Sequence, residues 1–304
     1  MQPLDFYAPC DSTACKLSEV RDKIAEIQRL AASRNLAIFW RGQRDHTWGM
    51  TSSLVRMLVK LGACDDAILD AVEERLLADA AQWIQELQQA PYLEPLARLA
   101  YMQHYGVPTR LIDFTTDPWT AVFFAAESDD HVDGRMFALL VEPGDTIGAT
   151  PLGRPWTTYP TNEVKVWDPV PAGITFPRLI HQRGVLAVGR LPSTRPHRIA
   201  RDLEAPRGLR SLLAEEVRRI LSIPFKLSRL GPKPSKAQAP IGFTFRIHVD
   251  KASVRRDLAG GGAMRRISPP GTSITHRDVY PDVDGLVRNS AFLRGLASGV
   301  LVLK

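Results

Sequence analysis

The sequence has few cysteines and no long apolar run. Its 304 residues include only three cysteines, Cys10, Cys15 and Cys64, which are odd in number and show no Cys-x-x-Cys spacing. This usage is typical of free thiols and argues against a disulfide framework or a structural zinc site. No stretch approaches the roughly 18 apolar residues that a membrane-spanning helix needs, so we do not expect a membrane protein.

The first residues also lack a basic flank followed by an apolar stretch. Because a secretory signal has both, we expect a cytoplasmic protein. What is present is an ordinary globular composition, with 44% hydrophobic and 24% charged residues. The sequence therefore predicts an ordered protein with a sizeable core.

The net charge of +6 conceals an uneven distribution. Residues 1–177 contain 15 Lys and Arg against 24 Asp and Glu, whereas residues 178–304 contain 24 against 9. Such an asymmetry indicates either a polyanionic partner for the basic part or ion pairing between the two parts. The sequence alone leaves both interpretations open.

Helical spacing of apolar residues predicts helices over residues 17–33 and 95–105, and another long helix within residues 65–89. A further helix is expected after Asp117, which can act as the N-cap, with Pro118 in the first turn. Alternating or continuous apolar runs predict four strands, over residues 36–40, 134–142, 184–190 and 243–249.

Other segments give weaker signals. Residues 109–114 read as a tight connector, residues 143–177 show no lasting period, and residues 226–242 are typical of an exposed basic loop. We expect no metal site. The segment 282–285 begins like a calcium loop, but the acidic residue that should close such a loop is missing.

Three segments carry side chains suited to chemistry: residues 40–43, 103–115 and 178–184. An arginine at a strand end beside a glycine, as in Arg41-Gly42, can bind a phosphate bidentately where the backbone is accessible. A buried ion pair of Arg41 with Asp113 or another carboxylate is the structural alternative, and Arg110 could equally pair with Asp113. His104 in the last turn of its helix could work as a cation or as a base.

These segments together resemble the FRG domain, a bacterial and phage-associated family named for a Phe-Arg-Gly tripeptide, with Trp40 here in place of the Phe. The run from Gln103 to Asp113 is similar to the family's Gln-His-x-Gly-x-Pro-Thr-Arg-Leu-x-Asp block, and the Ala-x-x-Phe-Ala helix follows it through Ala125. A late segment from Tyr280 also resembles the family's closing Phe-Pro-Asp-x-Asp-Gly. The likeness covers roughly residues 35–290 in pieces.

The order of these pieces also resembles ADP-ribosyltransferases, which cleave NAD. This resemblance implies that Arg41 holds the pyrophosphate or ribose and that Thr115 or Thr116 braces the nicotinamide. Gln182 stands where those enzymes use a glutamate, and a carboxamide cannot act as a base. His104, Asp113 or Glu163 would then have to supply the basicity.

The predicted site follows from both resemblances. The residues expected to be catalytic are Arg41, His104, Asp113 and Gln182. Those expected to bind NAD are Gly42, Gln43, Gln103, Thr109, Arg110, Thr115 and Thr116.

We expect one compact α+β unit, in which N-terminal helices pack on a mixed or antiparallel sheet with an ADP-ribosyltransferase-like split-sheet cleft. Its segments are a helical part (residues 1–34), an FRG core (35–200) and a basic part that completes the same domain (201–304). In that cleft Arg41, His104, Arg110, Thr115 and Gln182 should converge.

The leading hypothesis is an ADP-ribosyltransferase-like toxin or phage-defence effector, which uses NAD against a nucleic acid or a protein. The basic last third favours RNA or DNA as the target, and a toxin implies an antitoxin or chaperone as a further partner. One alternative is a non-catalytic module that binds nucleotides or nucleic acid. Another is a metal-independent ribonuclease with His104 and His181 as acid and base.

Overall fold

The computed structural model describes residues 2–62, 64–89, 92–128, 130–148, 160, 163–192, 199–201, 209–231, 238–260 and 274–282. Its main sheet has the strand order β1-β11-β4-β2-β3-β7-β6-β5, with β10 beside β11. The strands are β1 (Thr13–Ala14), β2 (Ala37–Gln43), β3 (Ile112–Thr115), β4 (Gly134–Val141), β5 (Thr146–Ile147), β6 (Val164–Trp167), β7 (Gly184–Gly189), β10 (Lys226–Leu227) and β11 (Ile241–Ile247). A separate pair is formed by β8 (Ile199–Arg201) and β9 (Leu209–Ser211).

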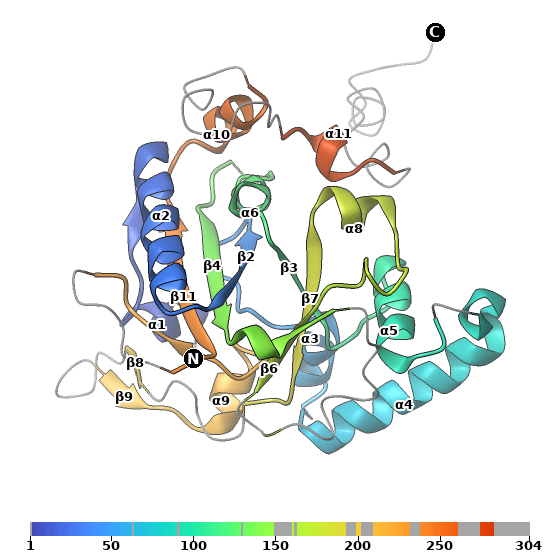
Figure 1. Cartoon of the computed structure of the whole chain (residues 1–304). Coiled ribbons are helices and arrows are strands. Elements are labelled where there is room, and N and C mark those ends of the chain that lie inside the picture. The colour runs from blue at the N-terminus through green and yellow to red at the C-terminus, as the bar shows by residue number, and fades with distance from the viewer. Residues whose placement is uncertain are drawn as a thin grey trace, which may run out of the picture.

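Helices lie around this sheet (Figure 1). The longer ones are α2 (Leu17–Ser33), α3 (Ser53–Lys60), α4 (Asp66–Trp83), α5 (Pro95–His104), α6 (Pro118–Ala125) and α10 (Lys251–Leu258). Short ones are α1 (Pro3–Tyr7), η1 (Gln85–Gln88), η2 (Pro143–Asp145), α8 (Pro177–His181), α9 (Ala214–Arg218) and α11 (His276–Val279). No helix in the described ranges is both long and apolar enough to cross a bilayer.

The predicted α+β fold is confirmed, and its sheet is mixed. The central pairs β11–β4, β4–β2, β2–β3, β3–β7 and β7–β6 are antiparallel. The outer pairs β1–β11, β10–β11 and β5–β6 are parallel. Because β11 pairs with β4 over seven register positions, the N-terminal and C-terminal parts of the chain share one sheet.

Both faces of the sheet are covered. Side chains alternate along a strand, so Trp40 packs under α2 and α6 while its neighbour Phe39 packs on the other face with Phe6 and Tyr7 of α1. All eight residues of β4 are buried, as a central strand between two covered faces requires.

Two glycines allow α6 to lie directly on the strands. A Cβ atom added at Gly42 of β2 would come within 1.8 Å of the Ala121 carbonyl oxygen, and one added at Gly134 of β4 within 2.2 Å of the Ala125 carbonyl oxygen. Since both obstacles are helix backbone, a side chain at either position would displace the helix. The glycine after Arg41 therefore has a packing reason, where we had expected it to open the backbone to a phosphate.

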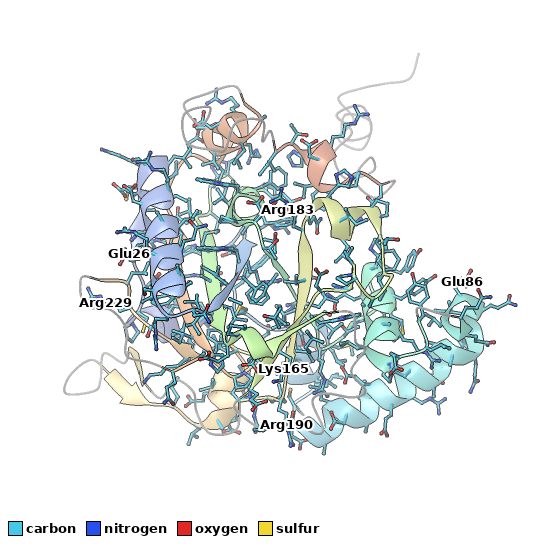
Figure 2. The ribbon with its side chains drawn as sticks, in the orientation of Figure 1. Glu26, Glu86, Lys165, Arg183, Arg190 and Arg229 are labelled. Carbon is cyan, nitrogen blue, oxygen red and sulfur yellow. The ribbon has the colours of Figure 1, made fainter. Side chains whose placement is uncertain are left out.

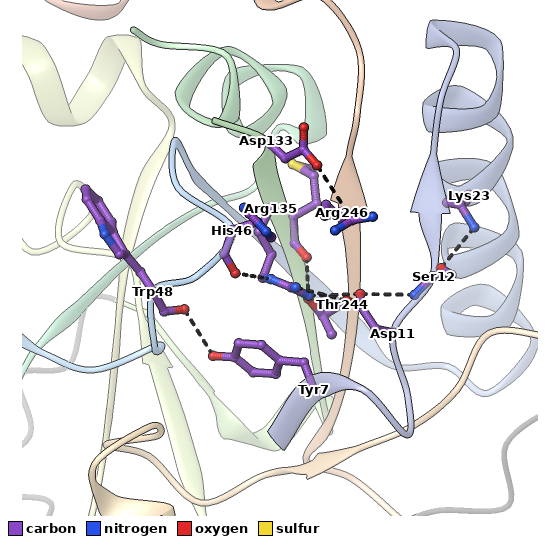
Figure 3. A network of polar contacts seen from close by, with 11 residues as sticks. Tyr7, Asp11, Ser12, Lys23, His46, Trp48, Asp133, Arg135, Thr244 and Arg246 are labelled. Atoms are coloured by element: carbon purple, nitrogen blue, oxygen red, sulfur yellow. Dashed lines mark hydrogen bonds and ion pairs between the residues drawn. The ribbon is translucent and has the colours of Figure 1, made fainter. Parts of the chain in front are cut away.

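A buried arginine ties the N-terminal segment to the sheet (Figure 3). The Arg135 guanidinium is fully buried and forms two 2.9 Å hydrogen bonds with the Asp11 carboxylate. It also donates to the main-chain oxygen of His46 and lies 4.5 Å from the centre of the Tyr7 ring. Burial raises the pKa of the Tyr7 phenol far above its ordinary value, so this ring stays neutral.

The helices with strong end signals are confirmed. α2 and α5 have almost the predicted bounds, Gly106 has a φ of +88° after α5, and the Asp117 carboxylate accepts from the first amides of α6. The long helix predicted within residues 65–89 is α4, which stops at Trp83 and is followed by the short η1.

The short strands were harder to predict. The prediction of a bare connector over residues 109–114 is wrong, because it contains most of β3. The 143–177 stretch contains β5 and β6, and the stretch expected to be a basic loop contains β10. β2 continues to Gln43, so Arg41 lies inside the strand, not at its end.

Candidate functional site

A cavity of about 300 Å³ opens where β2 and β3 meet. Its walls come from β2, β3, β7, the second half of α5, the end of α6, the segment before α8, α8 with the residue after it, and the segment after α11. The lining residues are Trp40, Arg41, Gly42, Ala100, Gln103, His104, Asp113, Phe114, Thr115, Phe124, Pro169, Ile174, Phe176, Arg178, Leu179, Gln182, Leu186 and Tyr280.

The cavity exists because β2 and β3 pair at a single position, Trp40 opposite Thr115. Beyond that pair the ladder stops, and the Arg41 side chain spans the gap instead, with Nη1 2.6 Å from the main-chain oxygen of Asp113. The expected alternative, an ion pair of Arg41 with the Asp113 carboxylate, is not what this contact shows. The guanidinium is held by a main-chain oxygen, and this contact leaves its other N–H donors unused.

One of those donors is unpaired. The buried Arg41 Nε has no hydrogen-bond partner within the described part of the chain. Burial lowers the pKa of Arg41, and the nearby charge of Arg56 on α3 adds to that shift, whereas the negative charge of Asp113 opposes it. A buried donor without an acceptor is unfavourable, so this position favours a ligand that brings an acceptor oxygen.

Asp113 is the exposed carboxylate of the cavity wall. Gln103 Nε2 donates to its Oδ1 at 2.6 Å, and the Thr109 hydroxyl in turn donates to Gln103 Oε1. Because Gln103 is held at both ends of its carboxamide, it fixes the orientation of Asp113. The carboxylate is thus positioned without being buried.

An aromatic pair forms another part of the wall. The imidazole of His104 lies parallel to the ring of Phe176, with ring centres 4.0 Å apart and an interplanar angle of 5°. As predicted, His104 occupies the last turn of α5. The stack fixes the plane of the imidazole at the cavity surface.

The predicted residues Thr115 and Gln182 lie at the same edge. The Thr115 hydroxyl donates to the main-chain oxygen of Gln182 at 2.7 Å and accepts from the Asp117 amide. The Gln182 carboxamide donates to the main-chain oxygen of Val279 in α11. Both side chains line the cavity while holding β3, α8 and α11 together, and Figure 1 shows these two helices side by side at this edge.

The segment that follows α11 closes the outer side of the cavity. Asp282 receives two hydrogen bonds from Arg178 of α8, at 3.1 and 3.2 Å. The Arg178 guanidinium lies 5.5 Å from the centre of the Tyr280 ring, and the Tyr280 hydroxyl donates to Glu127 at 2.7 Å. The other residues of the supposed calcium loop, 283–285, lie outside the described residues.

Four of the predicted NAD-binding residues do not line the cavity. The expectation that Arg110 reaches it is wrong, because its guanidinium is buried between Asp70 and Glu73 of α4. Thr109 is buried and reaches the site only through Gln103, and the carboxamide of Gln43 donates to the main-chain oxygen of Gly49. Thr116 is exposed outside the lining.

Two further candidates for acid and base also lie elsewhere. Glu163 forms an ion pair with Lys165 of β6. Figure 2 shows Lys165 at the opposite end of β7 from Arg183, which directly follows Gln182. His181 is exposed on α8 and is not among the lining residues. Of the three proposed sources of basicity, His104 and Asp113 remain.

Sequence reasoning missed Phe176 and Arg56. Phe176 lies in the stretch without periodicity, where no local pattern marks it as a partner of His104. Arg56 lies on α3, a helix that the sequence did not predict, and its link to the site is electrostatic, since Asp113 raises its pKa against the lowering effect of burial. Neither residue stands in a recognisable motif.

Residues 36–134 match the family model of the FRG domain. The chain contains an FRG domain. The match runs from the start of β2 to the first residue of β4, so the FRG domain supplies Arg41, Gln103, His104 and Asp113. The cavity residues on and around α8, and Tyr280, lie beyond it. No curated protein and no solved structure matches the chain.

Proposed function

We propose that the cavity binds NAD and that the protein breaks the bond between nicotinamide and ribose, passing ADP-ribose to an acceptor. The observation that supports this is the combination on one cavity wall of an arginine with an unpaired buried donor, a fixed aromatic pair and an oriented carboxylate. The arginine suits a phosphate, the aromatic pair suits a flat base, and the carboxylate suits a positive charge that develops on the ribose.

Arg41 would bind a phosphate oxygen, which satisfies its buried Nε and keeps the ligand's charge next to a cation. The His104–Phe176 pair offers a flat aromatic surface to the nicotinamide ring. In this orientation the ribose lies between the two, close to the exposed Asp113. A fixed position for both ends of the scissile bond is what lowers the entropy cost of reaction.

The reaction follows from these positions. The bond between ribose C1′ and the pyridinium nitrogen breaks, its electron pair goes to that nitrogen, and neutral nicotinamide leaves. The Asp113 carboxylate stabilises the positive charge that develops on the ribose. A hydroxyl or amine of the acceptor then bonds to C1′ from the opposite face, and its proton goes to Asp113.

A second candidate is a module that binds NAD or another nucleotide without cleaving it. The observation that favours it is Gln182, whose carboxamide is occupied by the Val279 carbonyl and cannot accept a proton. The ribonuclease alternative has less support, because His181 does not line the cavity.

The deciding experiment measures nicotinamide release from NAD, together with transfer of labelled ADP-ribose to total cellular RNA, DNA and protein. For Arg41→Ala we expect weaker NAD binding. For Asp113→Asn we expect NAD binding to persist and turnover to fall about 10²–10⁴-fold, the usual contribution of a general base. Arg75→Ala, at an exposed position on α4, is the matched control.

Each outcome decides between the candidates. Binding that Arg41→Ala abolishes, with no nicotinamide release by the parent protein, favours the non-catalytic module. Absence of both NAD binding and nicotinamide release by the parent protein contradicts the proposed function and restricts the second candidate to nucleotides other than NAD. Growth arrest on induced expression, relieved by Asp113→Asn, would support an effector that acts as a toxin, with a nucleic acid or protein as the acceptor.

A further inference from the structure

An aromatic cluster extends from the cavity wall to the protein surface. Phe176 is its centre, and four other rings surround it: Tyr92, Tyr101, His104 and Tyr105. The centres of Tyr101 and Tyr105 are 4.9 Å apart, and those of His104 and Tyr105 are 5.1 Å apart. Two members, His104 and Phe176, line the cavity, so the rings form one continuous surface that leaves it.

Tyr105 is the outermost ring and is 66% exposed. It caps α5, and Gly106 turns the chain away directly after it with a φ of +88°. Tyr101 packs against its inner side, and burial together with Tyr105 raises the pKa of the Tyr101 phenol to about 12. The Tyr105 ring is therefore held in place on one side and open to solvent on the other.

The size of the cavity indicates what this open ring is for. About 300 Å³ is at the lower limit of ligand cavities, which is enough for one half of a dinucleotide but not for the whole molecule. The other half must lie outside the mouth, next to residues that follow the cavity wall. Because the phosphate lies at Arg41, a dinucleotide that folds back at its pyrophosphate would bring the second base to the ring surface that begins at His104 and ends at Tyr105.

We propose that the exposed ring of Tyr105 is a stacking site for the adenine base of the dinucleotide whose nicotinamide half enters the cavity. This inference rests on the proposed function. A tyrosine ring that is already fixed loses little conformational freedom on binding, and stacking on a base is tolerant of the base's hydrogen-bonding pattern. The site thus contributes affinity for the adenosine half without taking part in bond cleavage.

The test compares NAD with nicotinamide mononucleotide, which lacks the adenosine half, by isothermal titration calorimetry. For Tyr105→Ala we expect the Kd for NAD to rise about 5- to 150-fold, the range that corresponds to loss of one base–aromatic stack. The Kd for nicotinamide mononucleotide should not change. Tyr105→Phe and Tyr105→Trp keep a ring and should bind NAD almost like the parent protein.

The matched control is Trp83→Ala on α4, an aromatic residue that is 86% exposed and outside the cavity lining. It should change neither Kd. An unchanged Kd for NAD in Tyr105→Ala would overturn the stacking site while leaving the proposed function intact. Equal weakening of both ligands would also overturn it, because Tyr105 would then act by supporting His104. If the parent protein binds neither ligand, the proposed function itself fails.

Discussion

At the scale of single residues, Arg41 and Arg110, two arginines within the FRG domain match, show how different the uses of one side chain can be. Arg41 and Arg110 both follow short apolar or turn-forming segments, but only Arg41 reaches the cavity. Arg110 is held by Glu73 at 2.7 Å and by Asp70, and all but 2% of it is buried. Arg110 therefore anchors α4 next to the start of β3, and its charge is unavailable to a ligand.

The buried partner of Arg110 gives a pH-dependent stability. Burial raises the pKa of Glu73 to about 7, and the attraction of Arg110 only partly offsets this effect. Because the folded-state pKa lies above the unfolded value of about 4.3, the folded protein holds this proton more tightly. The stabilisation of the fold by this tightly held proton is fully present below a pH of about 4.3 and is lost as the pH rises through about 7.

We therefore predict that the free energy of unfolding falls, relative to Glu73→Gln, by up to about 3 kcal/mol between pH 4.5 and 7. Urea unfolding across this pH range measures the difference. Glu74→Gln, at the adjacent exposed position, should follow the parent protein. A parent curve that stays parallel to that of Glu73→Gln would show that Arg110 fully compensates the burial.

At the scale of elements, the contact between α6 and the sheet explains the motif around Arg41. The small residues Ala121 and Ala125 of α6 face the glycines of β2 and β4, so helix and strand backbones touch. This contact fixes β2 beside the cavity. Because side chains alternate along a strand, Gly42 faces α6 and the neighbouring Arg41 points to the opposite face of the sheet.

Gly42→Ala should consequently destabilise the fold. Its Cβ would lie 1.8 Å from the Ala121 carbonyl oxygen and 2.7 Å from the Ala125 amide nitrogen, so either helix or strand must move. We expect a loss of at least about 3 kcal/mol, the upper part of the range for overpacked cores. Gly144→Ala is the control, because no atom lies within 4 Å of its added Cβ. Equal stability of the two variants in urea unfolding would contradict the close contact.

The elements that can be predicted from sequence are those whose ends have local capping residues. Asp117 before Pro118, and Gly106 after α5, define helix limits through local hydrogen bonds and backbone freedom, so sequence alone located them. β3 and β6 have four residues each and depend on partners far away in the chain, such as β7, so no local pattern marked them. For the same reason the sequence identified Arg41 and His104 as candidates but not Phe176, whose importance comes only from its contact with His104.

At the scale of the whole molecule, the acidic and basic parts of the chain are joined by ion pairs. Asp66, Asp130 and Asp133 of the acidic part pair with Arg190, Arg255 and Arg246 of the basic part, at distances of 3.5, 2.7 and 3.3 Å. Each pair is partly exposed. Ion pairing between the two parts therefore accounts for some of the charges. A polyanionic partner for the other basic residues stays a prediction.

These pairs should make the stability of the protein sensitive to salt. Attraction between parts of opposite charge is screened as the Debye length falls from about 30 Å to a few ångströms with rising ionic strength. We expect the free energy of unfolding to fall by about 1–2 kcal/mol between about 10 mM and 1 M NaCl, since each exposed pair contributes up to roughly 1 kcal/mol. Arg255→Met should reduce that salt dependence, whereas Lys60→Met, at an exposed position on α3, should not. If the free energy of unfolding instead rises with salt, repulsion among the excess positive charges, which give the net charge of +6, outweighs the attraction between the two parts.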